Sequence, residues 1–148
     1  TRSTPAHNRL FSATRCRRLM DIFDYFESLR RSIQQNYAIG FLKDPVMQAF
    51  DDHRGLFRAR IFFWDGSCLT VDEIVDTQAG YPDILSYSYT YVRDDKHLFR
   101  YDNAPHYPDL ENFPHHKHIG PAEIPEPSTQ PSLKQVFGEI ERILLAEE

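Results

Sequence analysis

Apolar side chains recur every three or four positions near both ends of the chain, which predicts two amphipathic helices. The first covers residues 19–35, with apolar positions at Leu19, Ile22, Phe23, Phe26, Leu29 and Ile33. The second follows the capping-box pair Ser132 and Gln135, with apolar positions at Leu133, Val136, Phe137, Ile140, Ile143 and Leu144. After the first helix, Gly40 and Pro45 interrupt regular structure, and a short strand is expected over residues 46–50.

The middle of the chain shows the alternation that is typical of β-strands. Every second residue from Phe57 to Phe63 is apolar, and Asp65-Gly66 follows, a pair that readily adopts the positive φ angles of a tight hairpin turn. Residues 85–92 have Ser86, Ser88 and Thr90 on one face and three tyrosines on the other. A second turn at Asp94-Asp95 leads into residues 98–101. These patterns predict an antiparallel meander of four to five strands.

Regularity ends after Asp102, because seven of the ten prolines lie between Pro105 and Pro131. The aromatic and histidine content of this proline-rich segment argues against disorder, so the segment is expected to be a long Pro/His-rich loop with a function. The fold class is therefore α+β: an N-terminal helix, the meander, the loop and a C-terminal helix. We expect one domain over residues 19–148, preceded by a disordered or additional tail over residues 1–18.

Charge and cysteine content narrow the functional classes. The net charge is −5, and five of the 17 basic residues fall in residues 1–18, so a broad basic surface for nucleic acid is not expected. A phosphate-binding role would depend on a local cluster of basic residues. No apolar run is long enough for a membrane span. The two cysteines, Cys16 and Cys68, fit neither a disulfide framework nor a zinc motif, which favours a reducing, cytoplasmic compartment.

Five of the seven histidines lie between residues 97 and 118. Pro114 favours an extended backbone before it, and in an extended segment His116 and His118 share one face while His115 and Lys117 point to the other. If this segment folds back on the end of the sheet, His106, His116 and His118 converge with Arg100 and Asp102.

The first interpretation of this constellation is metal-independent cleavage of RNA. One neutral histidine would take the proton of a 2′-hydroxyl, and a protonated histidine would give one to the leaving oxygen. Cationic side chains would stabilise the charge that develops at phosphorus, and tyrosines could stack on bases. The catalytic candidates are His106, His116, His118 and Asp102; the substrate-binding candidates are Arg100, Asn103, Lys117, His115, Tyr89 and Tyr91.

Two alternatives remain open at this point. His106, His116, His118 and Asp102 could instead bind zinc or manganese, although their spacing matches no known metal motif. The loop could also be a rigid surface that binds a partner without catalysis. On the first interpretation, no cofactor is required. The three tyrosines of residues 87–91 are more typical of a sheet face packed under a helix than of a base-stacking platform, and Arg58 and Arg60 are expected on the outer face of the hairpin.

Four motifs resemble the TumE family of toxins from toxin–antitoxin pairs. They are Asp65-Gly66-Ser67, Tyr87-Ser88-Tyr89-Thr90-Tyr91, the segment from Phe99-Arg100-Tyr101-Asp102 through Asn103-Ala104-Pro105-His106, and Phe113-Pro114-His115-His116-Lys117-His118. The last two are the more specific, and the resemblance extends over about residues 20–145. The residues that match the family pattern are Arg100, Asp102, Asn103, His106, His115, His116, Lys117 and His118. The chain departs from the pattern at Thr90 and Tyr107, where the family often has histidine. Neither position is then essential to the chemistry, or this member is impaired.

The resemblance implies a cytoplasmic toxin that acts on RNA or on the ribosome. It also implies a cognate antitoxin, a small helix-turn-helix protein encoded beside the toxin, and no membrane partner. Ribonuclease activity is expected by analogy with other toxins of this kind and does not follow from the fold.

Overall fold

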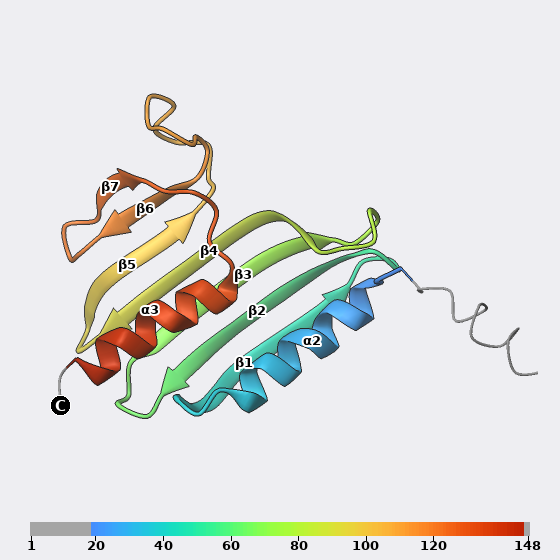
Figure 1. Ribbon diagram of the computed structural model, residues 1–148, viewed down its shortest axis with the longest axis horizontal. Coiled ribbons are helices and arrows are strands. Elements are labelled where there is room, and N and C mark those ends of the chain that lie inside the picture. Colours follow the sequence, from blue (N-terminus) through green and yellow to red (C-terminus); the bar gives the residue numbers. More distant parts are fainter. Residues whose placement is uncertain (1–18, 147–148) are drawn as a thin grey trace, which may run out of the picture.

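The computed structural model describes residues 19–146, which form one seven-stranded antiparallel sheet with two helices (Figure 1). The strands neighbour one another in chain order. They are β1 (Ile39–Ala49), β2 (Arg54–Phe63), β3 (Cys68–Asp76), β4 (Asp83–Arg93), β5 (Lys96–Asp102), β6 (His116–Ile119) and β7 (Ile124–Pro127). The α+β class is confirmed, but the expected strand count of four to five is too low. Residues 1–18, the predicted tail, lie outside the described part of the chain.

The two helices, α2 (Ile22–Gln35) and α3 (Leu133–Leu145), cover the same face of the sheet (Figure 1). Helix α2 begins after Asp21, whose side chain accepts a hydrogen bond from the backbone N–H of Asp24. Helix α3 begins with the predicted capping box, in which Ser132 and Gln135 bond each other's backbone N–H groups. Among residues 19–146, no helix covers the opposite face of the sheet. In the described part of the chain, no helix is long and apolar enough to span a membrane.

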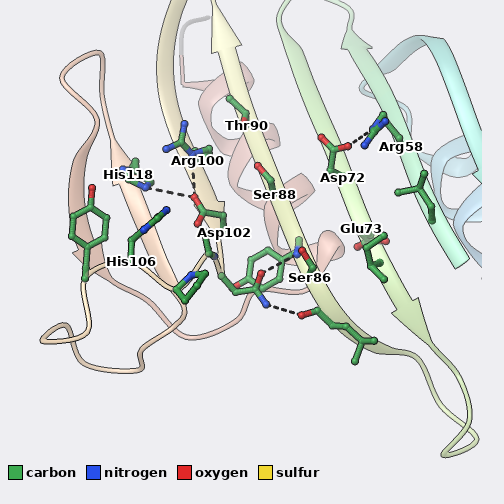
Figure 2. A pocket seen from close by; sticks show the side chains of 18 residues that line it. Arg58, Asp72, Glu73, Ser86, Ser88, Thr90, Arg100, Asp102, His106 and His118 are labelled. Carbon is green, nitrogen blue, oxygen red and sulfur yellow. Dashed lines mark hydrogen bonds and ion pairs between the residues drawn. The ribbon is translucent and has the colours of Figure 1, made fainter. Parts of the chain in front are cut away.

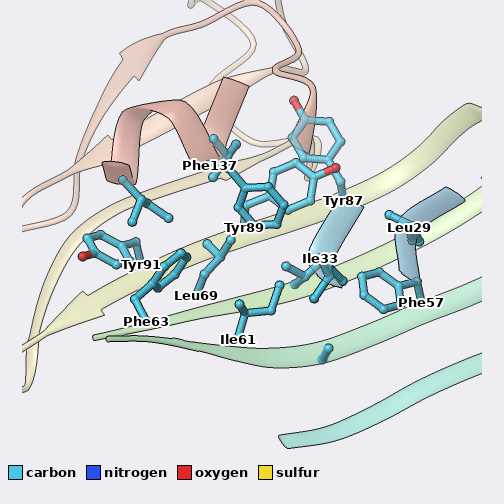
Figure 3. Packing of buried hydrophobic residues seen from close by; sticks show 14 of the residues in the cluster. Leu29, Ile33, Phe57, Ile61, Phe63, Leu69, Tyr87, Tyr89, Tyr91 and Phe137 are labelled. Carbon is cyan, nitrogen blue, oxygen red and sulfur yellow. The ribbon is translucent and has the colours of Figure 1, made fainter. Parts of the chain in front are cut away.

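The core lies between this helical layer and the sheet, and strand alternation fills it (Figure 3). Phe57, Ala59, Ile61 and Phe63 of β2 point into it, as the sequence predicted. So do Tyr87, Tyr89 and Tyr91 of β4, which confirms the interpretation of these tyrosines as a sheet face packed under a helix. The residues between them on the same strands are therefore directed to the uncovered face.

Strand β1 differs from the sequence-based expectation. The chain does not stay irregular from Asn36 to Pro45 but enters a strand at Ile39. The register shifts between Ile39 and Phe41 and between Lys43 and Val46, and Asp44 has a positive φ of 52°. These irregularities absorb Pro45, which is tolerated because β1 is an edge strand.

Strands β6 and β7 were predicted to be part of the Pro/His-rich loop. The loop is shorter than expected, because His116–Ile119 pairs with β5 and Ile124–Pro127 pairs with β6. Two of the four residues of β7 are prolines, which lack the N–H that a central strand must donate. An edge strand has a neighbour on one side only, so β7 can contain them.

Candidate functional site

The uncovered face of the sheet is hollowed by a pocket of about 960 Å³ (Figure 2). Strands β2 to β6 contribute to its lining, together with residues 103–107 that follow β5. Its polar side chains include Arg58, Ser88, Arg100, Asp102 and His118. Because the lining comes from five neighbouring strands, the sheet itself forms the floor of the pocket.

Two rows of side chains cross this floor, and the register of the sheet sets both. Residues paired across neighbouring antiparallel strands point to the same face. One row runs through Arg58, Asp72, Ser88, Asp102 and His116. The adjacent row runs through Arg60, Thr70, Thr90, Arg100 and His118. The sheet thereby brings together polar residues that are separated by almost sixty positions in sequence.

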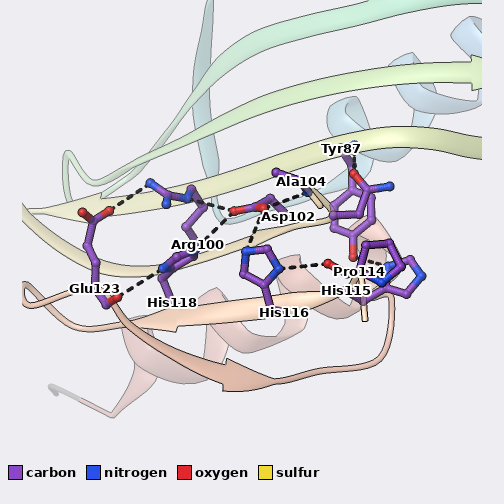
Figure 4. A network of polar contacts seen from close by, with 10 residues as sticks. Tyr87, Arg100, Asp102, Ala104, Pro114, His115, His116, His118 and Glu123 are labelled. Atoms are coloured by element: carbon purple, nitrogen blue, oxygen red, sulfur yellow. Dashed lines mark hydrogen bonds and ion pairs between the residues drawn. The ribbon is translucent and has the colours of Figure 1, made fainter. Parts of the chain in front are cut away.

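At the β5–β6 end of the rows, Asp102, His116 and His118 form a buried cluster (Figure 4). The Nε2 atom of His116 lies 2.9 Å from Oδ1 of Asp102, and Nε2 of His118 lies 3.5 Å from Oδ2. All three residues are buried, with 6 % or less of each exposed. The prediction that His116 and His118 share a face and converge with Asp102 is therefore confirmed by the geometry.

The other ring nitrogen of each histidine contacts a backbone carbonyl. Nδ1 of His116 donates to the carbonyl of Pro114 at 2.9 Å, and Nδ1 of His118 donates to that of Glu123 at 3.1 Å. A carbonyl oxygen can only accept, so Nδ1 carries the proton in both rings. Both Nε2 atoms are thus directed to the carboxylate and not to a backbone partner.

Asp102 is itself held in place by its neighbours. Its Oδ1 accepts a hydrogen bond from the backbone N–H of Ala104 at 3.0 Å, and its Oδ2 accepts one from Nε of Arg100 at 3.1 Å. Arg100 also donates to Glu123 at 2.9 Å, so its charge is shared between two carboxylates (Figure 4). Nearer β2, Arg58 forms an ion pair with Asp72 on the same floor.

His106 and Tyr107 lie at the entrance to the cluster. Both line the pocket and both are exposed. The Tyr107 ring packs edge-on against His116 and His118, with centroid separations of 5.3 and 5.8 Å, and His106 packs against Tyr107 at 6.2 Å. His106 therefore adjoins the cluster through Tyr107 and keeps a ring that a ligand in the pocket can reach.

Lys117 and His115 point to the helical side of the sheet, as alternation predicted. Lys117 donates to Glu139 of α3 at 2.5 Å, and its ammonium lies over the rings of Phe99 and Tyr101. Burial alone would lower the pKa of Lys117, but the hydrogen bonds with Glu139 and Tyr101 outweigh it and the pKa is raised. The ring of His115 stacks on that of Tyr87, and its Nδ1 atom forms a hydrogen bond with the Tyr87 hydroxyl at 2.8 Å. Neither residue lines the pocket.

Three other predicted substrate contacts have structural partners. Tyr89 is 1 % and Tyr91 0 % exposed; the hydroxyl of Tyr89 donates to Glu73 and that of Tyr91 donates to Ser67. Both rings lie in the core, out of reach of a base in the pocket. Asn103 lines the pocket, but its side chain clamps β4: its amide donates to the carbonyl of Leu85, and its Oδ1 accepts from the N–H of Tyr87.

Sequence reasoning missed several residues of the site. Arg58 was correctly expected on the outer face of the hairpin but was not connected to Asp102, because the connection depends on the register of four strands. Glu123 was not singled out, since its role rests on the pairing of β6 with β7. Thr90 and Tyr107, the two departures from the TumE pattern, both line the pocket. The histidines that the family often has at these two positions were the signal in the sequence that could have placed Thr90 and Tyr107 at the site.

Comparison with known proteins gives one result at the level of the family. Searches of curated proteins and of solved structures found no match. Residues 29–144, most of the chain, match the model of the family described as Toxin TumE. The chain therefore belongs to the TumE family.

Proposed function

We propose that this protein is the toxin of a toxin–antitoxin pair and that it inhibits growth by cleaving RNA in the pocket on the uncovered face of the sheet. Membership of a toxin family supports the first part. The observation that carries the second is the row of side chains that joins Arg58 to Asp102 and His116 across the pocket floor. Together with Arg100 of the adjacent row and His106 in the same pocket, this row brings phosphate-binding cations close to an accessible imidazole.

RNA cleavage of this kind requires three things. The 2′-oxygen forms a bond to phosphorus as it loses its proton, the bond from phosphorus to the 5′-oxygen breaks, and that oxygen gains a proton. His106 is the accessible proton acceptor, since its ring lies in the pocket and is exposed. Arg58 and Arg100 are placed to contact the phosphate, and guanidinium groups suit this task because they bind two oxygens at once.

The Asp102–His116–His118 cluster has a different role in this proposal. Sequence analysis treated His116 and His118 as a pair that exchanges protons with the substrate. In the structure both Nε2 atoms are turned to Asp102, and both rings are buried. We therefore assign proton removal to His106, and the 5′-oxygen takes its proton from water in the open pocket. We assign to the cluster the positioning of Arg100, whose guanidinium stabilises the charge on the phosphate.

The proposal extends to location and partner. The toxin acts in the cytoplasm on free RNA or on RNA of the ribosome. A cognate antitoxin, a small helix-turn-helix protein encoded beside it, neutralises it. Membership of a toxin family supports an antitoxin in general terms. Whether the gene beside the toxin gene encodes a small helix-turn-helix protein tests what kind of protein the antitoxin is.

The test is incubation of the purified full-length protein with total RNA, with and without a chelator. His106→Ala and the double variant His116→Ala/His118→Ala are each expected to lose about 100-fold or more in cleavage rate, the usual contribution of acid–base and charge-stabilising groups. The matched control is His97→Ala, because His97 is exposed on β5 and does not line the pocket. Absence of cleavage under all conditions, with growth inhibition intact in cells, would contradict the nuclease proposal and favour a toxin that binds its target without cutting it.

A further inference from the structure

The three donors of the buried cluster have the arrangement of a metal site. One carboxylate and two imidazoles offer ligand atoms that all lie within 4.8 Å of one another, and within the described residues this is the group that meets that condition. Ligands bound at 2.0–2.2 Å to one tetrahedral ion lie about 3.4 Å apart. The observed separations of 2.9 and 3.5 Å from the carboxylate oxygens bracket that value.

The hydrogen bonds behind the rings support the same interpretation. Histidines that bind metals donate their other ring N–H to a carbonyl or carboxylate, which fixes the tautomer and aims the free nitrogen at the metal. His116 and His118 do this through Pro114 and Glu123. The Nε2 lone pairs of both rings then face an anionic carboxylate, an arrangement that is repulsive unless a cation lies between them.

A shared proton does not account for His116. Its Nε2 atom is buried and has no hydrogen-bond partner among residues 19–146, although Oδ1 of Asp102 is only 2.9 Å away. The two atoms form no hydrogen bond despite this short distance, so a proton between them would not complete a good one. A buried polar atom without a partner is costly, and a third atom bound by both groups would remove the cost.

We propose that Asp102, His116 and His118 bind one divalent transition-metal ion of the Zn²⁺ class. Two imidazoles and one carboxylate favour such an ion over Mg²⁺ or Ca²⁺, which prefer oxygen ligands. Three protein ligands leave a coordination position open, as in catalytic sites and unlike closed structural ones. Asp102 and His118 line the pocket, so the open position faces it.

The surroundings suit a cation there. Arg100 lies 3.1 Å from Oδ2 of Asp102, but Glu123 takes up part of its charge at 2.9 Å. The Tyr107 ring packs edge-on against both imidazoles. Binding of the ion does not depend on the proposed function, whereas its role in stabilising the phosphate and leaving oxygen does rest on it.

The experiment is calorimetric titration of full-length, chelator-treated protein with Zn²⁺, accompanied by elemental analysis for stoichiometry. One ion per chain is expected, with no comparable binding of Mg²⁺. His116→Asn is the informative variant, because the asparagine amide can still donate to the carbonyl of Pro114 while Nε2 is lost. It and His118→Asn should each weaken Zn²⁺ binding about 10- to 100-fold or more. His97→Asn, on the exposed part of β5, should not.

A second measurement, the melting temperature of the wild-type protein, does not depend on whether the variants fold. Zn²⁺ at about 100 times its dissociation constant should raise the melting temperature of the wild-type protein by about 5 to 10 °C, because it binds only the folded state. Absence of stoichiometric binding, or equal binding by a His116→Asn/His118→Asn variant, overturns the metal site. RNA cleavage by a protein that binds no Zn²⁺ would overturn this inference and leave the proposed function standing. Stoichiometric Zn²⁺ binding without RNA cleavage would overturn the proposed function and leave this inference standing.

Discussion

At the residue scale, a second buried polar group lies on the helical side of the sheet, away from the pocket cluster. Glu73 is 2 % exposed and accepts hydrogen bonds from the hydroxyls of Tyr25 and Tyr89, both at 2.5 Å. Burial raises the pKa of Glu73 by more than these two hydrogen bonds lower it. The pKa values of both tyrosines are raised in turn, by burial and by the nearby carboxylate. The three side chains tie α2 to β3 and β4.

Glu73→Gln should change how stability depends on pH. Because the pKa of Glu73 is raised in the folded protein, the folded state holds its proton at pH values above the usual 4.5, where the unfolded chain has released it. The wild type therefore loses stability as pH rises from about 4.5 towards the folded-state pKa, and the glutamine variant lacks this loss. Urea unfolding of both proteins between pH 4 and 8 measures it. Parallel profiles would show that Glu73 does not titrate in this window.

At the element scale, strand β6 makes different contacts on its pocket face and on its helical face. His116 and His118 belong to the pocket cluster, whereas Lys117 between them joins the strand to α3 through Glu139. With β6 only four residues long, this ion pair is a main tie between the histidine strand and the helical layer. The position of the cluster therefore depends on a contact on the opposite face.

Lys117→Met tests this division of tasks. Methionine keeps the apolar stem over Phe99 and Tyr101 but removes the charge, which leaves Glu139 with its hydrogen bond from the hydroxyl of Tyr101 and without its cationic partner. We expect a loss of about 2 kcal/mol in the free energy of unfolding, the usual scale for a hydrogen bond between charged groups. RNA cleavage by the folded variant should stay near the wild-type rate, because Lys117 does not line the pocket. Urea unfolding and the cleavage assay measure the two effects.

The companion variant is Lys117→Met/Glu139→Gln, which removes both charges. It should recover part of the lost stability, since the single change leaves the partly buried carboxylate of Glu139 without a cationic partner. A large loss of cleavage at full stability in the single variant would instead return Lys117 to the substrate-binding role that the sequence suggested.

The same strands show what the sequence could and could not predict. Alternation placed His116 and His118 on one face, and turn chemistry located the bends at Gly66 and at Asp94-Asp95, where all three residues have positive φ. Prolines concealed the two edge strands, with Pro45 in β1 and both Pro125 and Pro127 in β7. A strand tolerates proline because of its edge position in the sheet, which the local sequence pattern does not reveal. The cross-strand rows require the register of the whole sheet. Arg58 therefore joined the site only in three dimensions.

At the scale of the whole molecule, placing both helices on one face leaves a broad sheet surface uncovered, and this surface is where we propose that RNA binds. The chain carries a net charge of −5, so attraction to RNA has to come from the few arginines on this surface. Arg58 and Arg100 lie in the pocket, and each is partly neutralised by a neighbouring carboxylate. We therefore expect the protein to bind the RNA backbone weakly and to contact only two or three phosphates.

The salt dependence of RNA binding tests this. In a His106→Ala background, which prevents cleavage, the logarithm of the affinity for single-stranded RNA should fall with the logarithm of salt concentration with a slope of about −1.4 to −2. Arg58→Gln should reduce the magnitude of the slope by about 0.7, the value for one phosphate contact. Asp72→Asn should act in the opposite direction and tighten binding, because it releases Arg58 from its ion pair. Fluorescence anisotropy at several salt concentrations provides the slopes.

The matched control is Arg31→Gln, which removes an arginine of similar exposure, also paired with one carboxylate, from α2 on the helical side. Its slope should equal that of the parent protein if RNA binds the uncovered face. An equal reduction by Arg31→Gln and Arg58→Gln would mean that RNA responds only to net charge and that the pocket is not its binding site. A slope much steeper than −2 would require phosphate contacts beyond the pocket. The arginines of residues 1–18 are the first to replace in that case, since they carry no neighbouring acids in the sequence.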